Sequence, residues 1–415
     1  MRIVQVDVVF GVLSTGKIVQ DLCDGLQKLG HEVLAAYGRG KKSSSLGVLK
    51  IASNAEVVFH AGMTRLTGWT GCFSPLATRR LKQAINEFQP DVVHLHEMHG
   101  YYVNINDILR FLGDRRIPIV WTFHSEFMYT GKCGYANECE RWKTGCHDCP
   151  QLRECPSSLL FDHTKQMYER KRGTFQFLSK LRLVTPSDWL KQRVGESFLR
   201  ERQVDIVYNG VDTTNVFYPR DRSMARARLG ITSKYVVVSV APKLMIPRKG
   251  GDWVLELARR MVEVDVTFLM IGVDADFRID SPNVTALPRT HDQQFLAEVY
   301  SASDVFLLPS QKETFSMVVV ESLACGTPVV GFDCGAPREV APDGYGHWVN
   351  YGDIDALQRV LVGVLDGSLP MKTREECRMF AENRYSKFSM VEKYLNIYRE
   401  LDGSMQPHRN LKQPA

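Results

Sequence analysis

Short apolar runs alternate with longer amphipathic stretches along the first half of the chain. Such runs are typical of strands buried in a sheet, and stretches with apolar positions three or four apart are typical of helices. The predicted strands are 2–9, 31–37, 91–96, 117–123, 181–185 and 206–212. The predicted helices are 15–30, 104–113, 163–179 and 187–199. Strands that alternate with helices form βαβ units, so this half predicts a parallel sheet.

The polar and basic stretch 220–234 predicts a linker, after which the alternation resumes. The later strands are predicted at 235–241, 266–272, 304–308 and 328–332. The later helices are predicted at 250–262, 292–301 and 316–325. The chain is therefore expected to have an α/β fold with two Rossmann-like domains that face each other across a cleft. We predict one domain over 1–212, a second domain over 213–385, a helix over 386–402 that packs back on the first domain, and a frayed tail over 403–415.

Composition narrows the class of protein. The chain has 415 residues, of which 44% are hydrophobic and 24% are charged, which is ordinary for a soluble globular protein of two domains. No apolar run reaches the roughly 20 residues that span a bilayer, and the chain starts directly with a strand, so we expect a cytoplasmic protein. The net charge of +5 is too small to indicate a nucleic-acid binder.

Two small clusters of cations are compatible with contact to anionic membrane lipids, although solvated surfaces also carry such charges. The clusters are Arg39, Lys41 and Lys42, and Arg79, Arg80 and Lys82.

Glu313 and Glu321 lie on either side of a predicted junction between a loop and a helix. Glu313 follows the apolar strand that ends at Leu308, and Glu321 lies within an otherwise apolar helix. A carboxylate in such a helix is costly unless it has a polar partner, such as ligand hydroxyls. The backbone amides of Thr314 to Met317 would face a phosphate. The alternative is a helix cap at Glu313 and a solvated face at Glu321.

Two further loops follow predicted strands and open helices. The loop Phe10 to Lys17 contains two glycines, which allow a ligand to approach the backbone, but a plain tight turn explains them equally well. The loop from Ala241 to Gly251 carries Lys243, Arg248 and Lys249, whose positive charges would face a diphosphate. The alternative there is a set of ordinary surface cations.

His124 ends the predicted strand 117–123, where an imidazole could contact a sugar hydroxyl or a developing charge, although a lone histidine is more often structural. His94, His96 and His99 form a weak candidate for a metal site, because His99 lies beyond the end of its strand.

A cysteine-rich insertion at about 130–156 has no clear periodicity and needs a staple. Four of its thiols, on Cys133, Cys139, Cys146 and Cys149, could hold a structural zinc ion, with Cys155 or His147 as substitutes. Free thiols, disulfides and an iron–sulfur cluster are the alternatives.

Taken together, the chain resembles the retaining GT-B glycosyltransferases of family 4 over nearly its whole length. The resemblance rests on the glycine loop through Gly16, 91–96, Thr122 to His124, Asn209 to Asp212, Lys243 to Gly250, and Glu313 to Val329. The insertion around Trp142 is similar to the branch of exopolysaccharide transferases of the colanic acid type.

The resemblance implies metal-independent transfer of a sugar from a nucleotide diphosphate sugar to an acceptor hydroxyl, with retention at the anomeric carbon. The resemblance makes 1–212 the acceptor domain and 213–385 the donor domain, and the acceptor would be a glycan or a lipid-linked oligosaccharide. His124, Glu313 and Lys249 would act at the reaction centre, and Glu321 would hold the ribose. The donor-binding set would be Gly16, Lys243, Arg248, Lys249, Glu313, Thr314, Phe315, Ser316, Met317 and Glu321.

Two positions differ from the family pattern. Thr314-Phe315-Ser316 stands where Gly-Phe-Gly is common, and Lys243 and Lys249 are six residues apart, so either Lys243 or Arg248 would be the first cation. A sugar-nucleotide epimerase and a non-catalytic nucleotide-sugar binding protein are the alternative functions.

Overall fold

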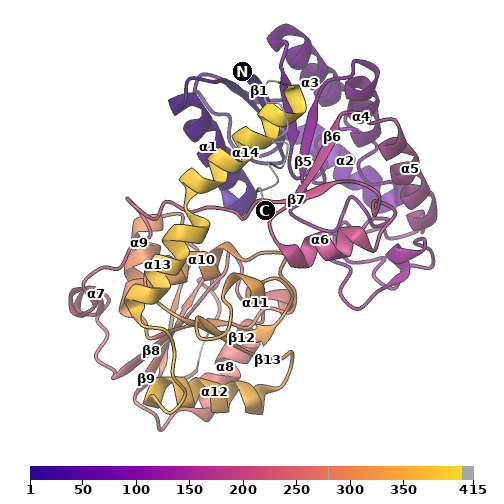
Figure 1. Cartoon of the computed structure of the whole chain (residues 1–415). Helices are drawn as coiled ribbons and strands as arrows, with labels where there is room; N and C mark the ends of the chain where they lie inside the picture. Colours follow the sequence, from indigo (N-terminus) through magenta and orange to yellow (C-terminus); the bar gives the residue numbers. More distant parts are fainter. Residues whose placement is uncertain (279, 404–415) are drawn as a thin grey trace, which may run out of the picture. The chain divides into compact units, whose positions relative to one another are not determined.

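The computed structural model describes residues 1–278 and 280–403, which form two compact units (Figure 1). The first unit contains Met1–Val207 and the chain from Met390 onward, and the second contains Tyr208–Ser389. Except for Gly403, the tail predicted to be frayed at 403–415 lies outside the described residues. None of the helices in the described part of the chain is long and apolar enough to cross a membrane.

The first unit is built on a parallel sheet with strand order β3-β2-β1-β4-β5-β6-β7. Its strands are β1 (Arg2–Asp7), β2 (Glu32–Tyr37), β3 (Val48–Lys50), β4 (Val92–Leu95), β5 (Ile119–Thr122), β6 (Leu181–Thr185) and β7 (Val204–Ile206). Its helices are α1 (Leu13–Lys28), α2 (Asn54–Thr67), α3 (Pro75–Phe88), α4 (Ile105–Asp114), α5 (Thr164–Gln176) and α6 (Asp188–Gly195), with a 3-10 turn η1 (Arg141–Lys143).

The second unit is built on a six-stranded parallel sheet with strand order β10-β9-β8-β11-β12-β13. Its strands are β8 (Tyr235–Val240), β9 (Val266–Ile271), β10 (Val284–Leu287), β11 (Val305–Leu308), β12 (Val329–Asp333) and β13 (Gly346–Asn350). Its helices are α7 (Arg222–Arg228), η2 (Pro247–Lys249), α8 (Gly251–Arg260), α9 (Gln293–Ala302), α10 (Met317–Ala324), α11 (Pro337–Val340), α12 (Ile354–Asp366) and α13 (Arg374–Tyr385).

Both faces of the second sheet are buried. Leu269 and Ile271 of β9 belong to one hydrophobic core cluster, whereas Phe268 and Met270 of the same strand belong to another. Because successive side chains of a strand point to opposite faces, the two clusters lie on the two sides of the sheet. This arrangement explains why the strands are continuous apolar runs, and it confirms the predicted parallel α/β organisation.

Each sheet has one place where the direction of winding reverses. In the first sheet it lies between β1 and β4, and in the second between β8 and β11. The loops that leave such neighbouring strands diverge, and they leave a crevice at the carboxyl ends of the strands where ligands bind. The loops that the sequence singled out, 10–17, 241–251 and 309–316, follow β1, β8 and β11.

Two predicted elements are wrong. The strand predicted at 206–212 ends as β7 at Ile206, because Val211 instead bonds residues 385–387: its amide donates to Tyr385 O at 2.9 Å and its carbonyl accepts from Lys387 N at 2.9 Å. The linker predicted at 220–234 contains α7. Its polar composition misled because Arg222 and Arg226 of this helix both pair with Asp304.

The last helix, α14 (Lys387–Asp402), supplies two buried tyrosines to the polar interior of the first unit. Tyr398 Oη accepts a hydrogen bond from Gln5 Nε2 at 3.1 Å and lies 2.6 Å from His94 Nδ1. Tyr394 Oη lies 2.8 Å from Thr122 Oγ1. Buried polar groups are costly when unpaired, so this end of the chain is needed to satisfy side chains on β1, β4 and β5.

Candidate functional site

The loops that follow β8 and β11 touch each other through their backbones. Gln311 N donates to Arg248 O at 2.9 Å. Gly250 has a φ of +74°, and a Cβ atom at this position would lie only 2.2 Å from Pro309 O. Only glycine accommodates both the left-handed conformation and this close approach. Gly250 therefore lets the cations before α8 reach the loop that carries Glu313.

Glu313 is a buried carboxylate held by two cations. Its side chain is 9% exposed, and its Oε1 lies 2.5 Å from Lys249 Nζ and 3.9 Å from Arg248 Nη1. Burial alone would raise the pKa of Glu313, but the charges of Lys249 and Arg248 hold this pKa below its usual value. Glu313 is therefore ionised and paired, and it does not act as a helix cap.

The backbone on both sides of Glu313 is fixed by the segment after β12. Glu313 N donates to Cys334 O at 2.9 Å, and Ala336 N donates to Glu313 O at 3.2 Å. The carboxylate thus projects from a backbone that is held on both sides.

Helix α10 starts directly after this loop, and its first residue is preceded by strained backbone. Ser316 has φ +80° and ψ +88°, in the left-handed region that glycine favours. Its hydroxyl is buried, and no residue that the structure describes bonds it. The first amides of a helix have no partner within the helix, so this end is suited to an anion.

Glu321 lies at the start of the second turn of α10, nearer its first residue than the sequence predicted. Its Oε2 accepts a hydrogen bond from Tyr300 Oη at 3.0 Å, and neighbouring Val319, Val320 and Leu323 are buried. Burial raises the pKa of Glu321 to about 7, although the Tyr300 hydrogen bond opposes this shift. Glu321 is therefore not on a fully solvated face.

In the first unit, a chain of hydrogen bonds leads to His124. Gln5 Oε1 lies 2.7 Å from His96 Nε2, and His96 Nδ1 lies 3.1 Å from His124 Nε2. Burial lowers the pKa of His124 to about 4, with a small opposing effect of Glu97. The imidazole is therefore neutral at pH 7, and it is held in place by β1 and β4.

Two buried carboxylates at the carboxyl ends of β1 and β4, Asp7 and Glu97, were not among the predicted site residues. Asp7 Oδ1 accepts from the amide of Glu97 at 3.0 Å, and Glu97 Oε1 lies 2.5 Å from His99 Nδ1. Their positions at the ends of adjacent parallel strands could have revealed them. His99 therefore pairs with Glu97. It does not join His94 and His96, with which it formed the candidate metal site.

The glycine loop after β1 is held by a hydrogen bond from Gly11 N to Gly16 O at 2.8 Å. A Cβ on Gly16 would lie 2.9 Å from Val9 Cγ2 and 3.0 Å from Val9 O. Gly16 therefore allows the start of α1 to pack closely on the end of the preceding segment.

Comparisons with known proteins agree with this geometry. Residues 15–215 match the model of Glycosyltransferase Family 4, and residues 234–366 match that of Glycosyl transferases group 1, so the two matches cover most of the chain. The chain belongs to the family 4 glycosyltransferases. It is 26% identical, over 90% of its length and 93% of the relative, to the putative colanic acid biosynthesis glycosyl transferase WcaC of Escherichia coli K12. It is also 33% identical to the D-inositol 3-phosphate glycosyltransferase of Mycobacteroides abscessus, over 37% of each protein.

Solved structures show the same fold. A sucrose-phosphate synthase from Thermosynechococcus elongatus superposes with a TM-score of 0.69, over 97% of this chain and 100% of that protein, at 16% identity. Anabaena HepE in complex with UDP superposes with a TM-score of 0.67, over 96% and 100%, at 15% identity. The glycosyltransferase described here therefore has the GT-B fold that was predicted.

The cysteine-rich insertion of this glycosyltransferase brings its four candidate thiols to one place. Cys133, Cys139, Cys146 and Cys149 line one small cavity. However, no three His, Cys, Asp or Glu side chains in residues 1–278 and 280–403 lie together in a way that could hold a metal ion. Cys133 and Cys149 are free thiols, and a hydrogen bond between them lowers the pKa of Cys149 and raises that of Cys133. The four-thiolate zinc site stays a prediction.

Two buried lysines bind backbone carbonyls in and next to this insertion. Lys132 Nζ donates to the carbonyls of Leu152, Glu154 and Pro156 at 2.8, 2.9 and 2.6 Å. Lys171 Nζ donates to the carbonyls of Phe127 and Thr130. Each ammonium group thus satisfies several carbonyls of a segment that has few backbone hydrogen bonds of its own.

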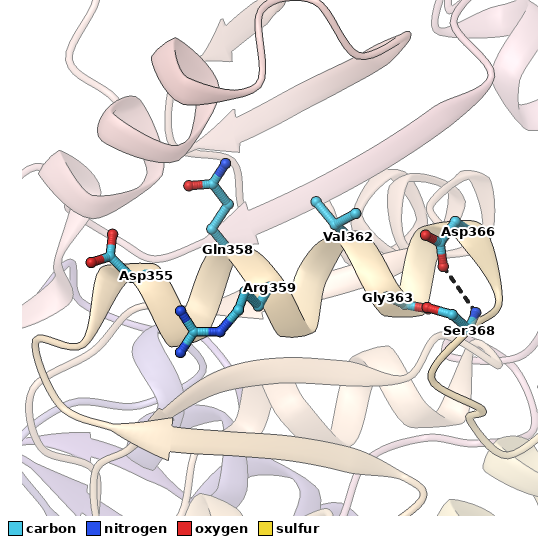
Figure 2. Close-up of a pocket in the computed structure, with 7 residues that line it drawn as sticks. All are labelled: Asp355, Gln358, Arg359, Val362, Gly363, Asp366 and Ser368. Carbon is cyan, nitrogen blue, oxygen red and sulfur yellow. Dashed lines mark hydrogen bonds between the residues drawn. The ribbon is translucent and has the colours of Figure 1, made fainter.

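A surface hollow lies along α12 in the second unit (Figure 2). It is lined by Asp355, Gln358, Arg359, Val362, Gly363, Asp366 and Ser368. It contains none of the predicted site residues, and its walls come from one helix and the turn after it. We therefore assign it no role.

Replacing Ser316 with glycine should stabilise the protein by roughly 1 kcal/mol, because glycine relieves the left-handed strain and removes a buried hydroxyl without a partner. Urea unfolding measures the change. Ser316→Ala is the control, since it removes the hydroxyl but keeps the strained Cβ and should gain less. A Ser316→Gly protein less stable than the wild type would contradict the strain.

Glu321→Gln should stabilise the folded protein at pH 8 but not at pH 4. The unfolded carboxyl ionises near pH 4.5 and the folded one near 7, so ionisation progressively favours the unfolded state as pH rises between these values. The glutamine variant escapes this loss, and its advantage at pH 8 should be roughly 1–3 kcal/mol. Urea unfolding across pH measures it, with the exposed Glu263→Gln as control. A pH-independent difference would argue against a raised pKa.

Proposed function

We propose that this glycosyltransferase moves a sugar from a nucleotide diphosphate sugar to an acceptor hydroxyl with retention at the anomeric carbon. The observation that carries the proposal is the cluster of Lys249, Arg248 and Glu313 beside the start of α10. Cations and a helix N-terminus at the carboxyl ends of β8 and β11 form a suitable site for the diphosphate. HepE in complex with UDP, which has the same fold, makes a uridine donor the first to test.

Arg248 is better placed than Lys243 to bind the diphosphate together with Lys249. Arg248 lies 3.9 Å from Glu313, whereas Lys243 is exposed and is not among the cations that pair with this carboxylate in the described residues. A planar guanidinium can also bind a phosphate through two hydrogen bonds. Arg248 and Lys249 would neutralise the charge that develops on the leaving diphosphate.

The other residues complete the proposed donor site. The amides of Thr314, Phe315, Ser316 and Met317 would bind phosphate together with the Ser316 hydroxyl, which has no partner among the described residues. Tyr300 donates to Oε2 of Glu321, so Oε1 of Glu321 would accept a hydrogen bond from the ribose. Glu313 would hold the sugar hydroxyls.

We further propose that transfer occurs on one face of the sugar without a metal ion. The bond from C1 of the sugar to the diphosphate breaks, the acceptor oxygen bonds to C1, and the proton of the acceptor passes to the departing phosphate oxygen. Electrostatic stabilisation of that phosphate by fixed cations and amides would lower the barrier. His124, which is neutral, would contact the sugar, while Gly16 would leave room for it in the first unit.

The similarity to WcaC suggests a role in exopolysaccharide synthesis, and hence a lipid-linked oligosaccharide acceptor at the inner face of the membrane. An epimerase would instead convert the sugar nucleotide without an acceptor, and a binding protein would bind it without turnover.

Substitution of the three cations by alanine should separate their roles. Lys249→Ala and Arg248→Ala should each lower kcat/KM by about 100-fold or more, as expected when a preorganised charge is lost from a transition state. Lys243→Ala, the matched control, should change it less than tenfold. Donor-dependent thermal shifts first establish which nucleotide sugar binds, and transfer is then measured with that donor. Full activity of Lys249→Ala would refute the proposed site.

The configuration of the new bond tests retention directly. With an α-linked donor we expect only α-linked product, because the acceptor enters on the face from which the diphosphate leaves. The one-bond proton–carbon coupling of the product's anomeric centre reports its configuration by NMR. A β-linked product would show inversion and overturn the one-face mechanism.

A further inference from the structure

One face of α2 exposes large apolar side chains to solvent. Val58, Phe59 and Leu66 are 71%, 60% and 52% exposed, whereas His60 and Thr64 on the opposite face are buried. Positions 58, 59, 62, 65 and 66 fall on one side of a helix with 3.6 residues per turn. The exposed side of α2 is therefore an apolar stripe that is not covered by the rest of its unit.

The loop after the insertion extends this stripe. Leu159, Leu160 and Phe161 are each more than half exposed. They are fixed beside the end of α2, because Leu159 N donates to Arg65 O at 2.9 Å and His163 Nδ1 lies 2.7 Å from Thr67 O. Six exposed apolar side chains thus lie on α2 and on the loop that is bonded to its end. Soluble proteins rarely expose apolar side chains in such a group unless they bind something.

Basic residues lie at both ends of the stripe. Arg65 is exposed on α2 itself, and the exposed loop with Arg39, Lys41 and Lys42 lies near the start of the helix. This second placement follows from Lys50, whose Nζ donates to Gly40 O at 2.7 Å and to Asn54 Oδ1 at 3.0 Å.

The other basic cluster of the sequence differs, because two of its cations are neutralised. Arg80 pairs with Glu56 at 2.8 Å, and Lys82 pairs with Asp107 at 2.5 Å. Asp162, the acid that follows the apolar loop, accepts hydrogen bonds from Cys149 N and from Thr164. The charged side chains at the ends of the apolar stripe are thus predominantly positive.

We propose that this surface, formed by Val58, Phe59, Leu66, Leu159, Leu160 and Phe161 with Arg39, Lys41, Lys42 and Arg65, docks on a bilayer that contains anionic phospholipid. Apolar side chains beside cations match the boundary between acyl chains and negative head groups. A second copy of the chain fits less well, since symmetric pairing of this surface would bring the same cations together. The inference specifies the membrane contact of the proposed function, but it requires no donor or acceptor.

Co-sedimentation of the full chain with vesicles tests the proposal. The wild type should bind vesicles of phosphatidylcholine with phosphatidylglycerol, and bind phosphatidylcholine alone at least about tenfold more weakly, with the difference shrinking as salt rises. Phe59→Ser combined with Leu160→Ser should weaken binding to both by about tenfold or more. Lys41→Glu combined with Lys42→Glu should remove only the preference for the anionic vesicles.

Met379→Ser combined with Phe388→Ser is the matched control, because these exposed apolar side chains lie in the second unit. It should bind vesicles as the wild type does. Circular dichroism and the donor-induced thermal shift of each variant show that it is folded and that its donor site is intact, so loss of docking is distinguished from failure of the proposed transferase activity.

Three results would overturn the proposal. The first is no binding of the wild type to the anionic vesicles, and the second is equal binding by the Phe59→Ser and Leu160→Ser variant. The third is a wild-type dimer in solution that these two substitutions dissociate, which would assign the surface to a second copy.

Discussion

The loops after β8 and β11 depend on the burial of one ionised carboxylate, Glu313, against Lys249 and Arg248. A buried charge without a partner is strongly unfavourable, so the loops after β8 and β11 must be held together for Glu313 to remain ionised. Gly250 makes this contact sterically allowed, and the segment after β12 fixes the backbone of Glu313. The same cations that satisfy Glu313 are those we propose for the diphosphate, so protein and ligand would share one set of charges.

The topology of each sheet explains where the polar groups gather. In both units the polar groups occur where the winding of the sheet reverses, and the carboxyl ends of adjacent strands bring together residues that are distant in sequence. Asp7 meets Glu97 in the first unit, and Arg248 meets Glu313 in the second. The helix α14 completes the first unit, because Tyr394 and Tyr398 bond polar side chains on the buried parts of β1, β4 and β5.

In the cysteine-rich insertion, buried lysines satisfy the hydrogen-bonding needs of irregular backbone. A segment with little regular structure has many backbone carbonyls that need donors, and a bound metal is one way to hold such a segment. Here Lys132 and Lys171 donate to several carbonyls each. The loop directly after the insertion places Leu159 to Phe161 beside the end of α2, so a buried polar interior is followed along the chain by an exposed apolar edge.

The sequence by itself determined the class of fold, most of the central strands, and the loops that follow β1, β8 and β11, because buried parallel strands are apolar runs and their following loops are polar. The sequence did not reveal the helices α2, α3, α12 and α13, because their amphipathic patterns were not distinguished from those of the neighbouring segments. It also did not reveal which residue each charged side chain pairs with. Tertiary structure decided that Arg248 lies beside Glu313 and that Arg222 and Arg226 belong to a helix. The physical reason is that burial and pairing depend on residues far apart in sequence, as with Glu313 and Lys249, and no local pattern records those distances.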